Sequence, residues 1–269
     1  MIDWLVMVAS AVGAVSVYDR APRLWVGDGV PGPTEFGGEW IELNAEQFHY
    51  VSRVMRLRDG DVVRVFGEMM GEYAASLEFR GTGRRASAWL SPLKSTRAPP
   101  CPQAPLELVF APLRKKRTSL LVEKAVELGA TALRAVRTEF TEKAAVAALG
   151  DEPISPAAVE AAEQSERLRV PLLYAPVPLR DLRLDVPLYV CLEREPGRPH
   201  LLDAASRARP GGIAVLVGPE GGFSDRDLAD LELSVPTAKK VSLGPNVLRA
   251  ETAAIAAVAI LAALRDRRS

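Results

Sequence analysis

The sequence is poor in histidine and cysteine, and this scarcity removes several kinds of chemistry from consideration. Only two of its 269 residues are histidine, His49 and His200, and only two are cysteine, Cys101 and Cys191. These residues are far apart and lack the spacing of zinc ligands, so we expect no metal site. A Ser-His-Asp triad is also a poor fit to so few histidines. Two isolated cysteines are typical of a reducing compartment, which predicts a cytoplasmic protein.

The sequence also lacks a long apolar run and an excess of either charge. No segment reaches the ~20 apolar residues that span a bilayer. The nearest, Trp4 to Val17, follows Asp3 instead of the basic residues that open a secretory signal, so we interpret residues 1–20 as an N-terminal extension. The 34 Lys and Arg residues balance the 34 Asp and Glu residues. A net charge of zero neither favours nor excludes nucleic-acid binding, because local patches such as Arg114 to Arg117 steer binding.

A proline-rich stretch divides the chain. Residues 96–105 hold four prolines within seven positions, and such a segment cannot continue a helix or a central strand. Before it, short strand-like runs at 61–66, 73–79 and 86–93 alternate with turns. This pattern predicts a small antiparallel barrel over residues 21–95.

After the proline-rich stretch, strand-like and helix-like segments alternate over residues 106–269. Alternation of this kind is typical of an α/β domain whose mostly parallel sheet is covered on both faces. Ser224, followed by Asp225 and Asp227, predicts a capped helix start. We expect strands at 106–112, 133–137, 188–192, 213–217 and 240–243, and helices at 115–128, 155–168, 224–233 and 251–264.

Two of the predicted strands run into a Gly-Pro pair and then into a helix. The first loop is Gly218-Pro219-Glu220-Gly221-Gly222, and the second is Gly244-Pro245-Asn246-Val247-Leu248-Arg249. Proline removes a backbone donor and glycine permits positive φ, so each strand must end in a tight, exposed turn. Two such turns at the carboxyl ends of adjacent strands would build a pocket lined by backbone groups. A single strand–glycine–helix turn is ordinary, but two copies, each carrying a charged residue, favour a binding site.

The two loops resemble the signature of the RsmE family, the uridine-N3 methyltransferases of small-subunit ribosomal RNA in the SPOUT (α/β-knot) class. The first loop matches as it stands, and the second matches as Leu243-Gly244-x-x-x-Leu248-Arg249-x-Glu251-Thr252. The match runs from about Pro22 to Leu264. Earlier segments match in the same order: His49 to Leu57 with Asp59-Gly60-Asp61, where Tyr50 replaces a common second histidine; Lys124 to Gly129; and Glu163-Gln164-Ser165-x-Arg167 with Val170-Pro171.

The resemblance implies a PUA-like RNA-binding β-barrel at 21–95, a linker at 96–105, and a SPOUT methyltransferase domain with a trefoil knot at 106–269. Knotted chains are rare exceptions to connection rules, so no periodicity predicts the knot. The resemblance also implies S-adenosylmethionine (SAM) as cofactor, N3 of a uridine as methyl acceptor, and 16S rRNA of the small ribosomal subunit or its precursor as partner. It further implies a homodimer. The segment Ala253 to Leu264 fits this, because a helix that is apolar nearly all round must be buried on several sides.

The family chemistry assigns roles to both loops. Arg249 is the expected catalytic residue, because a fixed guanidinium would stabilise negative charge on the uracil as N3 loses its proton. Its alternatives are binding the target phosphate and pairing with Glu251. Glu220 is expected to orient the ribose or the base; its alternatives are capping the next helix and pairing with Arg249. No residue is identifiable as the general base. The expected cofactor contacts are Leu192, Glu193, Gly218, Pro219, Gly221, Gly222, Leu243, Gly244, Leu248 and Thr252. The expected RNA contacts are His49, Arg53, Arg56, Arg114, Lys115, Lys116, Arg117 and Arg167.

Three other functions compete with this interpretation. A ribose 2′-O-methyltransferase of the same class would usually carry Asn where this chain has Arg249. A non-enzymatic RNA-binding protein would not need both cofactor loops. A nucleotide hydrolase is disfavoured because no Gly-x-x-x-x-Gly-Lys-Ser/Thr motif is present.

Overall fold

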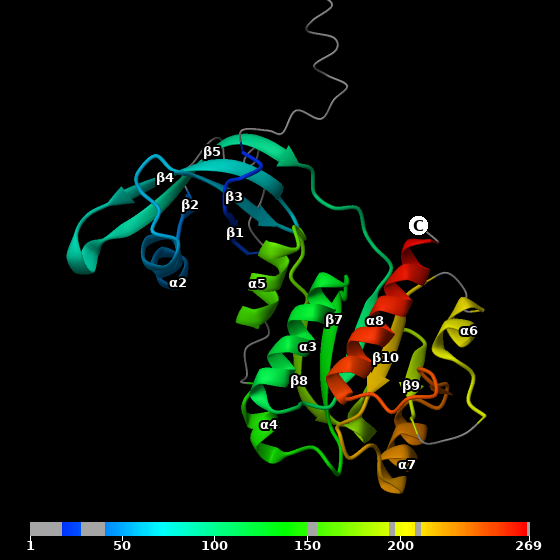
Figure 1. Ribbon diagram of the computed structural model, residues 1–269. Coiled ribbons are helices and arrows are strands. Elements are labelled where there is room, and N and C mark those ends of the chain that lie inside the picture. The colour runs from blue at the N-terminus through cyan, green and yellow to red at the C-terminus, as the bar shows by residue number, and fades with distance from the viewer. Residues whose placement is uncertain (1–17, 28–40, 150–154, 194–196, 208–210, 268–269) are drawn as a thin grey trace, which may run out of the picture. The chain divides into compact units, whose positions relative to one another are not determined.

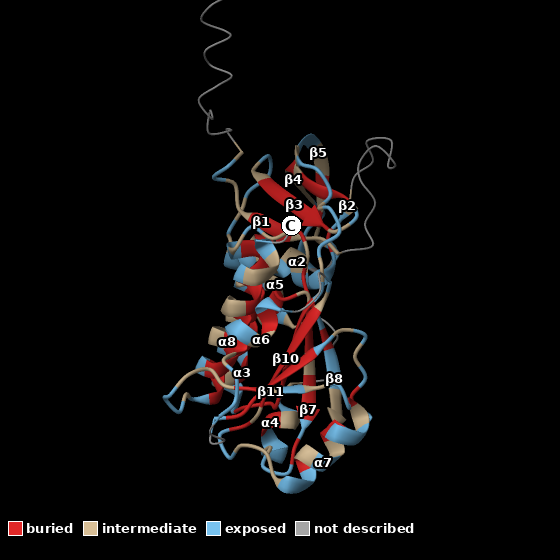
Figure 2. Ribbon diagram, turned by 90° about the vertical axis from the view of Figure 1, so that its right-hand side faces the viewer, coloured by how far each residue is buried: buried red, intermediate tan, exposed pale blue. Residues whose placement is uncertain are grey.

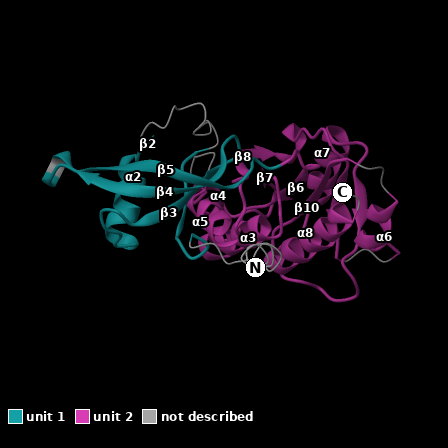
Figure 3. Cartoon of the chain, turned by 90° about the horizontal axis from the view of Figure 1, so that it is seen from above, with its two compact units in different colours: residues 1–100 teal, residues 101–269 magenta. Residues whose placement is uncertain are grey.

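The chain divides into two compact units, Met1–Pro100 and Cys101–Ser269 (Figure 3). The computed structural model describes residues 18–27, 41–149, 155–193, 197–207 and 211–267. Most of the predicted N-terminal extension, residues 1–17, lies outside the described residues. Each unit is considered by itself below.

The first unit is built on a five-stranded sheet with the order β1-β3-β4-β5-β2 (Figure 1). Most neighbours pair antiparallel, as expected, but β1 pairs with β3 in parallel. The residues of β3 are almost all buried (Figure 2). The strands are β1 Arg23–Trp25, β2 Ile41–Glu42, β3 Val62–Gly67, β4 Gly71–Arg80 and β5 Ser87–Arg97; α2 spans Ala45–His49, a π-helical turn η1 spans Tyr50–Val54, and a 3-10 turn η2 spans Gly83–Arg85.

A buried ion cluster lies inside the first unit. The Glu72 side chain is 1% exposed and accepts a hydrogen bond from Arg23 Nε at 2.7 Å and one from Thr96 Oγ1 at 2.9 Å. Arg64 Nη1 lies 3.7 Å from the same carboxylate. The Arg23 guanidinium also stacks on the Phe66 ring, 4.0 Å from its centroid. Burial lowers the pKa of Arg23, and the hydrogen bond to Glu72 opposes that change.

The second unit contains a six-stranded sheet with the order β11-β9-β10-β6-β7-β8, and every pair in it is parallel. This is the predicted α/β architecture. β10, in the middle of the sheet, is buried along its whole length, as parallel strands covered on both faces are (Figure 2). The strands are β6 Leu106–Phe110, β7 Ala132–Arg137, β8 Leu172–Pro178, β9 Leu188–Cys191, β10 Ile213–Val217 and β11 Lys239–Val241. The sequence pattern missed β8, an edge strand in which only one of seven residues is buried.

Helices of the second unit cover both faces of this sheet. α8 contacts α3, α6 and the strands β6 and β10, and α3 contacts α5 (Figure 1). α7 packs with the 3-10 turn η3 in a separate apolar cluster that includes Val190 and Leu216. The helices are α3 Lys115–Glu127, α4 Lys143–Ala147, α5 Pro156–Gln164, α6 Leu201–Ser206, α7 Asp225–Ser234 and α8 Ala250–Asp266, and η3 spans Leu179–Asp181.

The strand order places a crevice at the carboxyl ends of β9 and β10. The chain leaves β9 toward α6, which packs with α8, and leaves β10 toward α7, which packs with η3. Adjacent loops that diverge to different helical layers leave a crevice between them, and ligands of open α/β sheets bind in such crevices. The trefoil knot itself stays a prediction from the resemblance.

Candidate cofactor pocket and its rim

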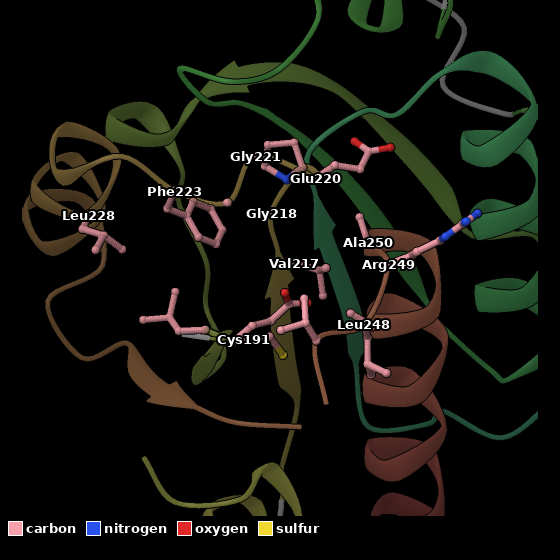
Figure 4. A pocket seen from close by; sticks show the side chains of 16 residues that line it. Cys191, Val217, Gly218, Glu220, Gly221, Phe223, Leu228, Leu248, Arg249 and Ala250 are labelled. Atoms are coloured by element: carbon pink, nitrogen blue, oxygen red, sulfur yellow. The ribbon is translucent and has the colours of Figure 1, made fainter. Parts of the chain in front are cut away.

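A pocket of about 440 Å³ opens at these strand ends (Figure 4). Its walls come from three segments that are distant in sequence: the end of β9, the loop after β10, and the start of α8. It is lined by Cys191, Leu192, Glu193, Val217, Gly218, Pro219, Glu220, Gly221, Gly222, Phe223, Leu228, Val247, Leu248, Arg249, Ala250 and Ala253. The two Gly-Pro loops therefore contribute to one site, but the strands that precede them, β10 and β11, are not adjacent as expected, because β9 lies between them.

Most of the expected catalytic and cofactor-binding residues meet in this pocket. Both expected catalytic residues, Glu220 and Arg249, line it, together with Leu192, Glu193, Gly218, Pro219, Gly221, Gly222 and Leu248. Three expected cofactor contacts, Leu243, Gly244 and Thr252, are not among the lining residues. The Ser242 hydroxyl bonds both the N–H and the carbonyl of Gly244 at 3.1 Å, which folds that segment into a turn before the chain reaches the pocket.

Several lining residues were not predicted from the sequence. Cys191 and Val217 lie within predicted strands, so their positions at strand ends were a usable signal. Phe223 and Val247 come from loops whose paths no sequence pattern gives. Burial raises the pKa of the Cys191 thiol to about 12, and the nearby Glu193 charge adds to this effect. Cys191 therefore presents a neutral thiol to the pocket at physiological pH.

The loop after β10 is shaped by close packing. A Cβ atom on Gly218 would lie 2.9 Å from the Phe223 ring, closer than real Cβ contacts come. The Gly222 N–H donates to the Pro219 carbonyl at 2.9 Å and closes the turn. Any side chain at position 218 would have to displace Phe223, another wall of the pocket. Glycine at this position lets the loop pack directly against the Phe223 ring.

The predicted N-cap of α7 is confirmed, and Asp227 of its capping box also binds a second loop. Ser224 and Asp227 form a capping box, with Asp227 N–H donating to Ser224 Oγ at 3.1 Å. The buried Asp227 carboxylate also accepts from the Glu139 N–H at 3.0 Å. It thereby ties the loop after β7 to the loop after β10.

An ion cluster lies at the rim of the pocket, and its pairing differs from the sequence alternatives. Arg117 Nη1 lies 2.7 Å from Glu220 Oε1, and Arg117 Nε lies 3.7 Å from Glu251 Oε1. Both acids thus pair with Arg117, and neither pairs with Arg249. Glu251 is buried, and its Oε2 accepts no hydrogen bond from the described residues.

Arg249 is the N-cap residue of α8 and is exposed. Within the described part of the chain its guanidinium makes no hydrogen bond or ion pair. Figure 4 shows the side chains of Glu220 and Arg249 extending away from Cys191, toward the rim. Arg249 is therefore a cation at the pocket edge whose donors are available.

The expected RNA contacts fall into different environments. The Arg167 guanidinium donates to the carbonyls of Val126 at 2.6 Å and Ala130 at 2.7 Å, and burial lowers its pKa to about 10. These contacts favour a structural role at the end of α3. Arg114 pairs with Glu142 at 3.3 Å near the rim. The side chains of Lys115, Lys116, His49, Arg53 and Arg56 are exposed.

The residues that the structure describes contain neither a candidate metal site nor a candidate membrane-spanning helix. These residues contain no group of three or more His, Cys, Asp or Glu side chains that could hold a metal ion. No described helix is long and apolar enough to cross a membrane.

The fold and the pocket define a class of protein: an α/β domain that holds a small ligand where two parallel strands of its sheet end and their loops diverge. The model of a known family, the RNA methyltransferase domain, matches residues 99–262. The chain is 32% identical over 223 residues to the ribosomal RNA small subunit methyltransferase E of Rickettsia conorii, covering 81% of this chain and 88% of that one. It is 31% identical to the Synechocystis protein of the same name, covering 88% of this chain and 77% of that one. The chain belongs to this family of RNA methyltransferases, the RsmE family.

Solved structures agree on the fold. A Legionella pneumophila methyltransferase in complex with bound SAM superimposes with a TM-score of 0.71 at 25% identity, covering 91% of this chain and 98% of that one. The Neisseria gonorrhoeae ribosomal RNA small subunit methyltransferase E, also solved with S-adenosyl methionine, gives a TM-score of 0.70 at 22% identity over the same shares.

Proposed function

We propose that this protein transfers the methyl group of SAM to N3 of a uridine in the 16S rRNA of the small ribosomal subunit. The observation that carries the proposal is the convergence of both family loops on one pocket with Arg249 at its rim. The relatives' names and the SAM complexes of two structural neighbours support the substrate class and the cofactor.

The pocket suits SAM by its size and by the chemistry of its walls. Its walls combine apolar side chains such as Leu192 and Leu248 with the exposed backbone of the Gly218–Gly222 turn. Apolar walls with a few polar groups are typical of cofactor sites. The Glu193 carboxylate, at the end of β9, would accept hydrogen bonds from ribose hydroxyls. Bound SAM would supply an electrophilic methyl carbon, and the S–C bonding pair would stay on sulfur after transfer.

Arg249 would assist the acceptor. A neutral uridine is a weak nucleophile at N3, so the N3–H proton must leave to a base or to water as the N–C bond forms. Negative charge then develops on the uracil oxygens. A planar guanidinium already held at a helix start would stabilise that charge without reorganising.

The surface of α8 supports a homodimer. Ala253, Ala257 and Leu261 are buried within the unit, whereas Ile255, Ala256, Ala259 and Ile260 are only half-buried. Half-buried apolar residues recurring along one side of a helix form a stripe that needs a partner. The stripe begins next to the pocket, so dimerisation would complete the surroundings of the pocket.

For the first unit, we propose RNA contacts from His49, Arg53 and Arg56.

The direct test is to identify the methylated atom. Purified protein, SAM and small ribosomal subunits from cells lacking the gene should yield 3-methyluridine at one position, and that position should be unmethylated in those cells. A 2′-O-methylated nucleotide would instead support the ribose methyltransferase alternative. Tight SAM binding with no methylation of any ribosomal particle would overturn the assignment of the substrate.

A further inference from the structure

A second cavity, of about 360 Å³, adjoins the cofactor pocket in the second unit. The two share Pro219, Glu220 and Gly221, so one loop separates them. The second cavity is lined by Pro112, Leu113, Arg114, Arg117, Phe140, Glu142, Ala145, Pro219, Glu220 and Gly221. Its lining combines two arginines and two glutamates with an aromatic ring.

Phe140 is the unusual member of this set. It is 49% exposed although it is a large apolar residue. It sits in a turn closed by bonds between Thr138 and Thr141: the Thr138 N–H to Thr141 Oγ1 at 3.1 Å, the two hydroxyls at 2.8 Å, and the Thr141 N–H to the Thr138 carbonyl at 3.2 Å. The preceding residue, Glu139, is tied to Asp227. These bonds therefore fix the backbone that carries the exposed ring.

The ring lies directly beside the cofactor loop. A Cβ atom on Gly221 would lie 2.9 Å from Phe140 Cβ and 3.1 Å from Cγ. Only glycine allows the two loops to approach this closely. A planar ligand stacked on Phe140 would therefore lie next to the wall shared with the cofactor pocket.

The charges around the ring suit an anionic ligand. α3 begins with Lys115, Lys116 and Arg117 and has no acidic residue in its first turn. Cations at a helix start oppose the helix dipole, and a bound anion would offset this cost. Arg114 and Arg117 are paired with Glu142 and Glu220, but these pairs are exposed. Exposed pairs are weak, so a phosphate would compete for the guanidinium groups.

We propose that the second cavity receives the target nucleotide after it has left the RNA stack. Its pyrimidine ring stacks on Phe140, and its phosphate binds at Arg114 and the start of α3. This inference rests on the proposed function, since it takes RNA as the substrate. Enzymes that modify a base extrude it from the stack, and aromatic side chains recognise unstacked bases by stacking. The base would then lie against the loop Pro219–Gly221, which also lines the pocket of the methyl donor.

Measuring the affinity of two proteins for two RNA fragments tests the stacking. Wild type and Phe140→Ala are each titrated with an rRNA fragment carrying the mapped uridine and with the same fragment carrying an abasic nucleotide there. Stacking predicts that Phe140→Ala weakens binding of the uridine fragment by about 10- to 100-fold and leaves binding of the abasic fragment nearly unchanged. Phe140→Trp should keep the tight binding. Leu233→Ala, which removes an 81% exposed side chain from α7, is the matched control.

Independent readouts separate the possible failures. SAM affinity, measured by calorimetry, should stay at the wild-type value in Phe140→Ala and shows that the variant is folded. Equal losses on both fragments would overturn the stacking, even where 3-methyluridine is still formed. A change of oligomeric state in Phe140→Ala would assign the ring to a protein contact and overturn the inference. If Phe140→Ala weakens binding of the uridine fragment alone but the wild-type protein forms a methylated nucleotide other than 3-methyluridine, only the proposed chemistry is wrong. If the wild-type protein methylates no RNA, both the proposed function and the stacking are wrong.

Discussion

The two units each contain an arginine–glutamate cluster, and the clusters differ in how completely they are satisfied. In the first unit, both carboxylate oxygens of Glu72 have partners, and the cluster is sealed from solvent. In the second unit, Arg117 serves two acids, the Arg117 and Glu220 side chains are 38% and 46% exposed, and one oxygen of Glu251 lacks a hydrogen bond from the described residues.

The difference separates a structural role from a functional one. A buried charge pair is weak evidence for added stability, but removing one partner is costly because the other charge stays buried and uncompensated. An exposed pair has little influence on folding and is easily exchanged for a ligand. We infer that the Glu72 cluster fixes the sheet of the first unit, whereas the Arg117 cluster is a site where substrate contacts replace protein contacts.

The largest expected effect is that of Glu72→Gln on stability. The change removes the carboxylate that pairs with the buried guanidinium of Arg23 at 2.7 Å and lies 3.7 Å from that of Arg64. We expect the free energy of unfolding of the first unit to fall by ~3–5 kcal/mol, measured by denaturant titration. Glu78→Gln, which breaks the exposed pair with Arg80, is the control and should change little. Similar losses in both variants would remove the contrast between the clusters.

Arg249→Lys should have the next largest effect, on the reaction rate. The variant keeps the charge but loses the planar fork, so methyl transfer at saturating SAM and RNA should fall by ~10²–10³-fold. SAM affinity should change little, because the pocket walls are largely backbone and apolar groups. Single-turnover methylation of small subunits measures the rate, with Arg226→Lys on the exposed side of α7 as control.

Other outcomes for Arg249→Lys would reassign the residue. Weaker RNA binding with a shallower salt dependence, at an unchanged saturated rate, would make Arg249 a phosphate contact. A near-normal rate with normal RNA binding would remove it from the chemistry altogether.

Ile255→Lys tests the proposed dimer and should have a smaller effect. Because Ile255 is half-buried, a lysine should be tolerated in the isolated unit but not within an apolar interface. We expect the dimer dissociation constant to rise at least ~30-fold, the loss that corresponds to ~2 kcal/mol at an interface hot spot. Sedimentation across a concentration series measures it, and Leu233→Lys is the surface control. A wild-type protein that sediments as a monomer at all concentrations would contradict the dimer.

Much of the second unit could be predicted because local signals there agree. Val215 to Val217 is apolar and ends at Gly-Pro, and Ser224 with Asp227 marks the next helix, so strand, turn and helix follow from neighbouring residues. β8 escaped prediction because an edge strand with exposed Leu172 and Tyr174 lacks a clear apolar pattern. The parallel pairing of β1 with β3 escaped because it joins segments about 40 residues apart.

The candidate site was predictable where a single loop carries it, and less so where several loops meet. Gly218 and Arg249 belong to motifs, and their loops were expected to converge because parallel strands end at one edge of a sheet. The expectation that their strands are adjacent was wrong, since β9 lies between β10 and β11. The pairing of Arg117 with Glu220 spans 103 positions of sequence, and no local pattern encodes it. No sequence signal distinguishes Phe140 from the other apolar residues. Only the folded chain brings it against Gly221.

The smallest expected effect is the coupling between Arg117 and Glu220. Both side chains are more than one third exposed, so solvent screens the pair, and a double-mutant cycle with Arg117→Met and Glu220→Gln should give a coupling below ~1 kcal/mol in the free energy of unfolding. Arg117→Met should cost more than Glu220→Gln, because it also removes the cation nearest to the buried Glu251 carboxylate. The position of Glu251 in the first turn of α8 lessens that cost, since the helix dipole stabilises a carboxylate there. Denaturant titration of the four proteins gives the cycle, and SAM affinity serves as the check on pocket geometry. A coupling as large as the loss expected for Glu72→Gln would make the rim cluster a structural brace, and the contrast between the two units would then be wrong.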